Sequence, residues 1–241
     1  MLKIPVVKGN LNKAYFKFKS ALRFLFTSED WWMLDEMLNE ELELGVKSRY
    51  HFYANPKKTL SLKRWFFDPG YDINQSSMHN FFQKMIKNNY EIGIHPSFKT
   101  WSSKIEILHQ VNYLSKVSMH PIKVCRQHWL RFSWFKTWKA QLSAGIEKDT
   151  TLMFNDRPGF RNGSAIAWNP FHFNSESKLD IEALPTLMMD SHFYDYNQFT
   201  NDERYKNMKR WIKECKDTHG EVAVLWHPHT LTIDYGWKSG F

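Results

Sequence analysis

The sequence predicts one α/β domain whose strands run mostly parallel and are covered by helices. From about residue 46 onward, segments of strand character alternate with helical segments, which is typical of parallel strands joined by crossover helices. The chain has 241 residues, with no internal repeat and no convincing linker, and this length fits one domain with a substantial core. We therefore expect a single domain over 1–241, with a helical segment at 1–45 and the sheet in 46–241.

Two helices are expected before the first strand. Residues 14–26 are basic and aromatic, so this helix could lie on an anionic membrane surface or pack its aromatic side onto the domain. A second helix is expected to start near Thr27, because Thr27 and Asp30 have the spacing of a capping box. Its leucines recur at helical spacing, and Gly45 ends it.

Strands and helices then alternate. Six strands are expected, at 49–54, 91–95, 122–126, 150–154, 183–189 (interrupted by Pro185) and 221–226. Helices are expected at 81–87, 103–116, 133–144 and 200–220. Capping boxes mark the start of two of these helices, at Ser103 with Glu106 and at Thr200 with Glu203.

Composition limits the partners. The formal net charge is +8, but the basic residues are spread along the chain without a basic run or a nucleic-acid motif. We therefore expect no nucleic-acid partner, whereas anionic lipid or polysaccharide stays open. Aromatic residues make up 17% of the chain, which can fill a core or stack on sugar rings.

The two cysteines, Cys125 and Cys215, are far apart and match no zinc spacing, so we expect reduced packing residues. No segment approaches the roughly 18 apolar residues that cross a bilayer, and no signal-peptide core is visible near Met1. The sequence thus predicts a cytoplasmic protein without a transmembrane segment.

Ionisable side chains gather where the expected strands end, as in the sites of barrel enzymes. His95 ends the stretch Glu-Ile-Gly-Ile-His-Pro-Ser, and Arg126 and His128 end the next strand. A later segment with Pro-Gly and Asn-Gly turns carries Asp149, Asp156, Arg157 and Arg161, and His227 follows the last strand.

These motifs, in this order, resemble the polysaccharide deacetylase superfamily, in particular a deacetylase-like subgroup found with surface-polysaccharide genes. The resemblance covers about Gly45 to His229 and implies a distorted (β/α) barrel of about seven strand–helix units. Aligning the motifs makes 49–54 the second strand. The first strand, which ends in an Asp-x-Asp motif in relatives, is then expected before Met1, and only the short segment 2–7 remains here.

In this family an aspartate and two histidines hold a divalent metal, most often zinc, which polarises the acetyl carbonyl and activates water. The resemblance implies that His95 is a metal ligand and that His227 protonates the leaving group. It also implies that Arg126 orients the catalytic base, but the base aspartate is missing here, so a structural role or a bond to a substrate carboxylate stays open. Lys99 stands where the second metal histidine is expected, and a protonated ammonium cannot ligate, so we expect His128 to substitute for it. The alternative for His95 and His128 is a hydrogen-bonded structural role.

Trp129 keeps the aromatic position of the family's third motif, although the proline of that motif is lost. We expect Trp129, Trp226, Arg131, Asp156 and Arg161 to contact the sugar. An alternative is that Asp156 and Arg161 pair with each other and rigidify their loop. His229 is expected to support His227 or to be exposed.

The expected function is metal-dependent hydrolysis of N- or O-acetyl groups on a polysaccharide or its precursor. The alternatives are a non-catalytic carbohydrate-binding relative and an N-terminally truncated enzyme, because the aspartates of the first strand are missing. An open barrel would expose the edge of strand 49–54, so we expect a homo-oligomer or a partner that covers it.

Overall fold

The computed structural model describes residues 32–56, 67–68, 70–197, 199–232 and 235–241. The chain forms two compact units, one containing the described residues up to Glu40 with His227–Phe241, and the other Glu41–Trp226. The helix expected at 14–26 and the capping box at Thr27 lie outside the described residues. That 1–241 is one domain stays a prediction.

The first unit contains the start of α3 (Leu34–Leu44), with η3 (Pro228–Leu231) and η4 (Lys238–Gly240). Lys238 Nζ binds the carboxylates of Glu36 and Glu40, which ties η4 to α3. As expected, α3 ends before Gly45, which has a φ of 65°. Glycine adopts this left-handed conformation without the steric cost of a side chain.

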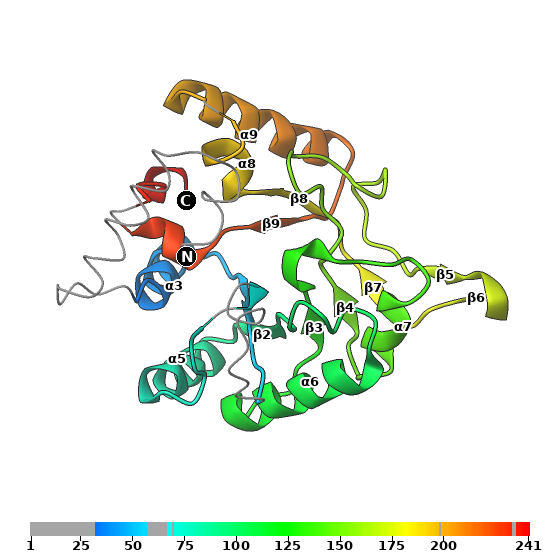
Figure 1. Cartoon of the computed structure of the whole chain (residues 1–241). Helices are drawn as coiled ribbons and strands as arrows, with labels where there is room; N and C mark the ends of the chain where they lie inside the picture. Colours follow the sequence, from blue (N-terminus) through cyan, green and yellow to red (C-terminus); the bar gives the residue numbers. More distant parts are fainter. Residues whose placement is uncertain (1–31, 57–66, 69, 198, 233–234) are drawn as a thin grey trace. The chain divides into compact units, whose positions relative to one another are not determined.

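The second unit is built on a five-stranded parallel sheet with the order β1-β2-β3-β4-β7. These strands are β1 (Arg49–Phe52), β2 (Glu91–Ile94), β3 (Val124–Cys125), β4 (Lys148–Asp149) and β7 (Glu182–Ala183). Parallel pairing confirms the prediction of a parallel α/β sheet (Figure 1). Within the described part of the chain β1 pairs with β2 alone, and the closed barrel stays a prediction.

Three helices connect these strands: α5 (Ser76–Lys87), α6 (Lys104–Ser118) and α7 (Thr137–Leu142). Phe81, Phe82 and Met85 of α5 are fully buried with Ile92 and Ile94 of β2, so this part of the core lies between helix and sheet. The expected cap of α6 is confirmed, because Ser103 Oγ accepts a hydrogen bond from the Glu106 amide at 3.3 Å. The short helix η1 (His128–Leu130) follows β3.

The fourth strand was predicted at the wrong residues. It covers Lys148–Asp149, and the segment 150–154 that follows has no strand assignment. Thr150 and Thr151 are buried, and their hydroxyl groups contact the segment after β3. Thr150 Oγ1 accepts a hydrogen bond from Arg126 Nε, and Thr151 Oγ1 accepts one from the Gln127 amide. Backbone bonds continue beside them, from the Thr150 amide to Cys125 O and from the Thr186 amide to Leu152 O, both at 2.9 Å, but they do not form a regular ladder.

Pro185 divides the fifth expected strand, as predicted, into β7 and β8 (Thr186–Met189). Proline has no amide hydrogen for a ladder bond. β8 then pairs in parallel with β9 (Ala223–Leu225). Leu187, Met188 and Phe193 bury a second apolar cluster with Cys215 of α9.

Two helices complete this end of the unit: α8 (Asp190–Tyr194) and α9 (Asn201–Asp217). The capping box of α9 is confirmed, because the Thr200 amide donates to Glu203 Oε2 at 2.7 Å and Thr200 Oγ1 accepts from the Glu203 amide at 3.3 Å. Both cysteines are free and buried, and no helix in the described ranges is long and apolar enough to span a bilayer.

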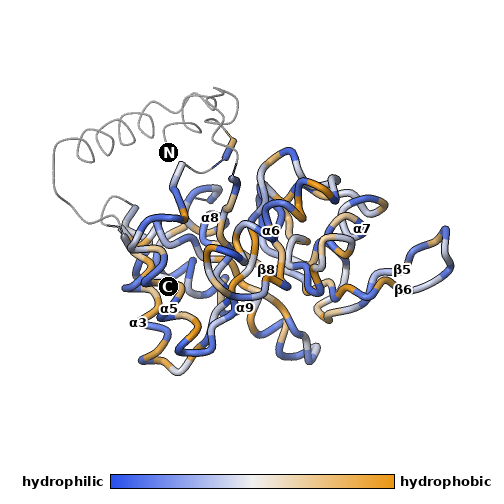
Figure 2. Tube along the Cα trace, turned by 90° about the horizontal axis from the view of Figure 1, so that it is seen from below, coloured by the Kyte–Doolittle hydropathy of each residue, from blue (hydrophilic) through white to orange (hydrophobic). Residues whose placement is uncertain are grey.

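Several short elements were not predicted, among them α8 and one hairpin. A hairpin of β5 (Phe171–His172) and β6 (Ser177–Lys178), joined through η2 (Phe173–Ser175), projects from the rest of the second unit in both views (Figures 1 and 2). Its strands are two residues long and their side chains are partly or fully exposed, so they lack the apolar alternation that marks a half-buried strand.

Candidate functional site

The candidate site lies at the carboxyl ends of the parallel strands, where side chains from consecutive strands meet. β1 contributes His51, the end of β2 contributes His95, and the end of β3 contributes Arg126, with His128 two residues later. Thr150 follows β4. The sequence analysis identified His95, Arg126 and His128, and the structure brings these three together.

The imidazoles of His95 and His128 face each other, with His95 Nε2 2.6 Å from His128 Nδ1. The other nitrogen of each ring contacts a backbone carbonyl: His95 Nδ1 lies 2.8 Å from Arg126 O, and His128 Nε2 contacts Phe67 O. A carbonyl oxygen only accepts hydrogen bonds. Both outer nitrogens therefore carry a proton, so when both rings are neutral each facing nitrogen has a lone pair, and the 2.6 Å contact is a hydrogen bond only when one ring carries a second proton.

Two facing lone pairs repel unless a positive charge lies between them. A proton is disfavoured, because desolvation of the ring lowers the pKa of His95 well below its ordinary value, and the neighbouring His128 and His51 lower it further. A metal cation satisfies both lone pairs, and ligating histidines commonly donate their second N–H to a backbone carbonyl. The two facing nitrogens are donors of the type that a divalent metal takes, but zinc–nitrogen bonds are about 2.0–2.1 Å long, so the rings must move apart from their 2.6 Å spacing to hold an ion.

The pair does not make a complete metal site by itself. Within the described ranges, no group of three or more His, Cys, Asp or Glu side chains could hold an ion. Lys99, at the position of the expected second family ligand, is exposed.

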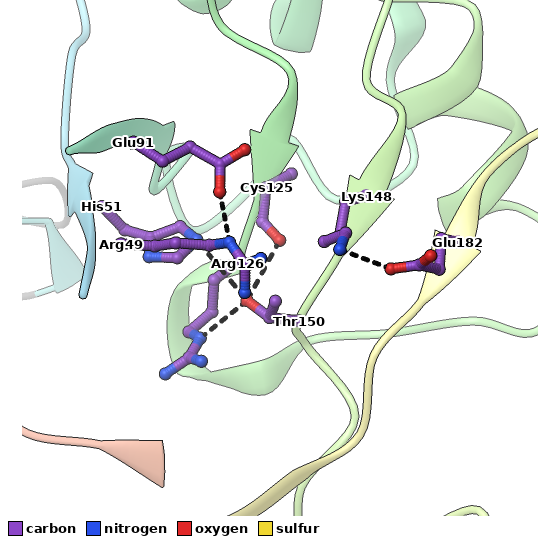
Figure 3. Close-up of polar contacts among 8 residues, drawn as sticks. All are labelled: Arg49, His51, Glu91, Cys125, Arg126, Lys148, Thr150 and Glu182. Carbon is purple, nitrogen blue, oxygen red and sulfur yellow. Dashed lines mark hydrogen bonds and ion pairs between the residues drawn. The ribbon is translucent and has the colours of Figure 1, made fainter. Parts of the chain in front are cut away.

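Arg126 is buried, and its guanidinium is held by hydroxyl groups, of which Figure 3 shows that of Thr150. Its Nε donates to Thr150 Oγ1 at 3.1 Å and its Nη2 to Thr186 Oγ1 at 3.2 Å. Desolvation lowers the pKa of Arg126 to about 10, although the charge of Asp149 opposes this shift. In the described part of the chain no carboxylate forms an ion pair with this guanidinium.

His51 was missed by the sequence analysis. Its Nε2 lies 3.5 Å from Thr150 Oγ1, on the same hydroxyl that Arg126 binds (Figure 3). Desolvation, and then the charge of Arg126, lower its pKa well below the ordinary value, so the ring is neutral near pH 7. In the sequence, the only indication of a site role for His51 was its position between two aromatic residues inside a predicted strand.

Asp149 belongs to the scaffold. Its carboxylate accepts hydrogen bonds from Trp138 Nε1 at 3.1 Å, Gln141 Nε2 at 2.8 Å and Thr151 Oγ1 at 2.5 Å. Burial raises the pKa of Asp149, and the three donors oppose that shift. These bonds fix α7 and the segment after β4, which supports the loops of the site.

Trp129 lies beside the histidine pair, with its ring centroid 6.3 Å from that of His128. The rings of Phe67 and Phe98 stack on each other at 4.5 Å and meet Trp129 edge to face at 5.9 and 5.8 Å. Trp129 is 50% exposed and has a φ of 57°, followed by Leu130 at 51°. Two consecutive left-handed residues with side chains are strained, and such strain clusters at functional sites.

A solved structure decides the fold. No family model and no curated protein matches this chain. The crystal structure of a "putative polysaccharide deacetylase" from Mycobacterium smegmatis matches with a TM-score of 0.52 and 16% sequence identity, over 82% of this chain. The chain has a polysaccharide deacetylase-like fold. The match spans 64% of the other protein's length.

In this deacetylase-like fold the expected sugar-contacting residues have several different environments. Arg131 donates from Nη1 to Phe98 O at 2.9 Å, and its guanidinium lies 4.3 Å over the Phe98 ring. Asp156 is exposed and pairs with its neighbour Arg157 at 3.2 Å. Arg161 Nη1 reaches the carbonyls of Leu130 and Met153, both at 3.4 Å.

The suggested pairing of Asp156 with Arg161 is therefore wrong. Arg161 instead bridges the loop after β3 to the segment after β4, because two carbonyls lie within its reach. That bridge rigidifies the loop by another route.

The last two expected site residues fall in different units. Trp226 packs against Tyr194 at a centroid distance of 6.2 Å in the second unit. His227 belongs to the first unit, where its ring lies 5.5 Å from that of His229 and its carbonyl accepts from Thr230 Oγ1 at 2.7 Å. The roles of Trp226 and His227 stay predictions.

Proposed function

We propose that this protein is a metal-dependent carbohydrate deacetylase that removes N- or O-acetyl groups from a polysaccharide or its precursor. The observation that carries the proposal is the approach of His95 Nε2 and His128 Nδ1 to 2.6 Å, while the other nitrogen of each ring contacts a backbone carbonyl. The deacetylase-like fold supports it. His95 and His128 would hold a divalent ion such as zinc, which, when bound, activates a carbonyl and a water molecule for hydrolysis.

The remaining side chains have roles that follow from their contacts. The Arg126 carbonyl fixes the tautomer of His95. Besides desolvation and the neighbouring histidines, the buried guanidinium of Arg126 is near enough for its charge to lower the pKa of His95, and this charge would stabilise the negative charge that develops on an acyl oxygen or orient a carboxylate base. Trp129 offers its exposed face to a sugar ring, and His227 is the proposed acid for the leaving group.

A second candidate is a carbohydrate-binding protein without catalysis. It is favoured by the absence of a third ligand within the described ranges and by the hydroxyl partners of Arg126. Such a protein would keep the aromatic surface at Trp129 but would release no acetate.

Two measurements on the full chain test the proposal: zinc stoichiometry by calorimetry, and acetate release from acetylated oligosaccharides. We expect one zinc ion per chain, with zinc-dependent acetate release. His95→Ala and His128→Ala should each abolish both, whereas the matched control His109→Ala, an exposed histidine on α6, should change neither. Zinc binding that survives both site substitutions would overturn the proposal. Sugar binding without acetate release would establish the second candidate.

A further inference from the structure

A second aromatic surface lies where α7 begins, at the end of the loop that follows His128. Trp134 is 51% exposed and Phe135 73% exposed. Large exposed aromatic side chains at adjacent positions are unusual on a protein surface and commonly mark a binding area. The residues already assigned to the histidine pair do not include them.

Trp134 is held in place from below. Its ring meets Trp138 edge to face at 5.2 Å and Phe132 at 5.5 Å. Trp138 is itself buried and donates from Nε1 to Asp149. A supported ring loses little conformational entropy on binding, which suits a planar stacking surface.

The loop that follows His128 links this surface to the candidate site along the chain. Arg131 lies between Trp129 and Trp134 in the chain and stacks on Phe98, which also contacts Trp129. The loop from His128 to Trp134 thus carries aromatic rings from the histidine pair to the start of α7. A ligand longer than one sugar unit can contact both ends of this loop.

The charge of residues 126–146 indicates which kind of polysaccharide this surface would bind. Between Arg126 and Ile146 there is no Asp or Glu, whereas Arg126, Arg131, Lys136 and Lys139 are basic. Lys136 and Lys139 are exposed, directly beside the aromatic surface. Exposed cations favour a ligand with negative groups, and aromatic faces favour sugar rings.

We propose that Trp134 and Phe135, with Lys136 and Lys139, bind further units of an acidic, acetylated polysaccharide whose reacting unit lies at the His95–His128 pair. The inference rests on the proposed function and specifies its substrate class. Under this inference, Trp134 and Phe135 determine the preference of the protein for a polymer over a short sugar.

The test uses hyaluronan oligosaccharides, in which N-acetylglucosamine alternates with glucuronate, and uncharged chitin oligosaccharides of equal length. Binding to the full chain is measured by calorimetry. The wild type should bind the hyaluronan octasaccharide about tenfold more tightly than the disaccharide, the gain of a stacked aromatic contact. The double variant Trp134→Ala/Phe135→Ala should lose this length advantage and keep its affinity for the disaccharide.

One further variant tests the lysines of the surface, and another serves as a control. Lys136→Gln/Lys139→Gln should weaken binding of the hyaluronan octasaccharide and leave the chitin octasaccharide unchanged. Tyr205→Ala, which removes a 64% exposed aromatic side chain from α9, is the matched control and should change neither. Circular dichroism confirms that each variant is folded.

Other outcomes overturn the inference. These are equal affinity for long and short chains, unchanged octasaccharide binding in the Trp134/Phe135 variant, or no binding of any probe. A change of oligomeric state in that variant would assign the surface to contacts between copies. Tighter binding of an oligodeoxythymidine through the same side chains would assign it to nucleic acid. The proposed function is decided separately, by zinc stoichiometry and acetate release.

Discussion

The imidazole of His51 occupies the space above Gly93. The two residues are partners in the β1–β2 ladder, and a β-carbon on Gly93 would lie 2.7 Å from His51 Cδ2 and 2.9 Å from Nε2. Only glycine leaves room for the ring at this position. The glycine in the stretch before His95 therefore has a structural reason: it seats His51 at the floor of the candidate site.

Gly93→Ala should lower the free energy of unfolding by about 1–3 kcal/mol, because the new methyl group forces the His51 ring or a strand to move. Urea unfolding measures this. Gly70→Ala is the control, since nothing lies within 4 Å of its added carbon. Adding His51→Ala should recover part of the loss. Equal stability of the Gly93 and Gly70 variants would show that the ring does not constrain this position.

Arg126→Met and Arg131→Met form a matched pair. Arg126 is buried, and its side-chain hydrogen-bond partners among the described residues are hydroxyl groups. Replacing this charged side chain with methionine should therefore leave the free energy of unfolding unchanged or raise it by about 1 kcal/mol. Arg131→Met should lower stability by about 1 kcal/mol, because it removes the bond to Phe98 O and the stacking on that ring. The reverse order, measured by urea unfolding, would reveal a carboxylate partner for Arg126 outside the described residues.

Stability should fall as the pH drops from about 6.5 to 4. Desolvation lowers the pKa of buried His192 to about 4, and Nδ1 accepts from the Met189 amide at 3.3 Å, a bond that protonation would break. The unfolded chain therefore binds more protons in this window, and the slope from this residue is at most about 1.4 kcal/mol per pH unit. His192→Gln should flatten the pH profile of unfolding, whereas His109→Gln should not. An unchanged profile in His192→Gln would contradict the assignment.

Trp129→Gly and Trp129→Ala should differ in stability although both remove the ring. Glycine relieves the left-handed conformation at this position, where φ is 57°, so the glycine variant should be more stable than the alanine variant by about 1 kcal/mol. Both should lose the same sugar affinity, because the exposed indole is absent from each. Thermal unfolding and sugar titration measure the two effects, and a glycine variant less stable than the alanine variant would rule out strain at Trp129.

The parts of the fold that local chemistry determines could be predicted. The caps at Ser103 and Thr200 depend on residues three positions apart, and the break at Pro185 depends on one missing amide hydrogen. The meeting of His95 with Arg126 and His128 could also be expected, because carboxyl ends of neighbouring parallel strands share one edge. The fourth strand was misplaced because bonds to distant side chains determine where it ends.

Contacts that depend on tertiary structure had no sequence signal. His51 enters the site because its register partner is a glycine. Arg161 contacts carbonyl oxygens, which every residue carries, so no residue type in the sequence could indicate its partners. For the same reason the tautomers of His95 and His128, fixed by the carbonyls of Arg126 and Phe67, could not be predicted.

The central claim is that His95 and His128 present their facing nitrogens to a metal ion. The most direct test is nitrogen-15 NMR of the histidine rings in the full chain during zinc titration. We predict that zinc shifts the resonances of His95 Nε2 and His128 Nδ1, while His95 Nδ1 and His128 Nε2 stay protonated throughout. Zinc-induced shifts at the opposite nitrogens, or no shift at either ring, would contradict the claim.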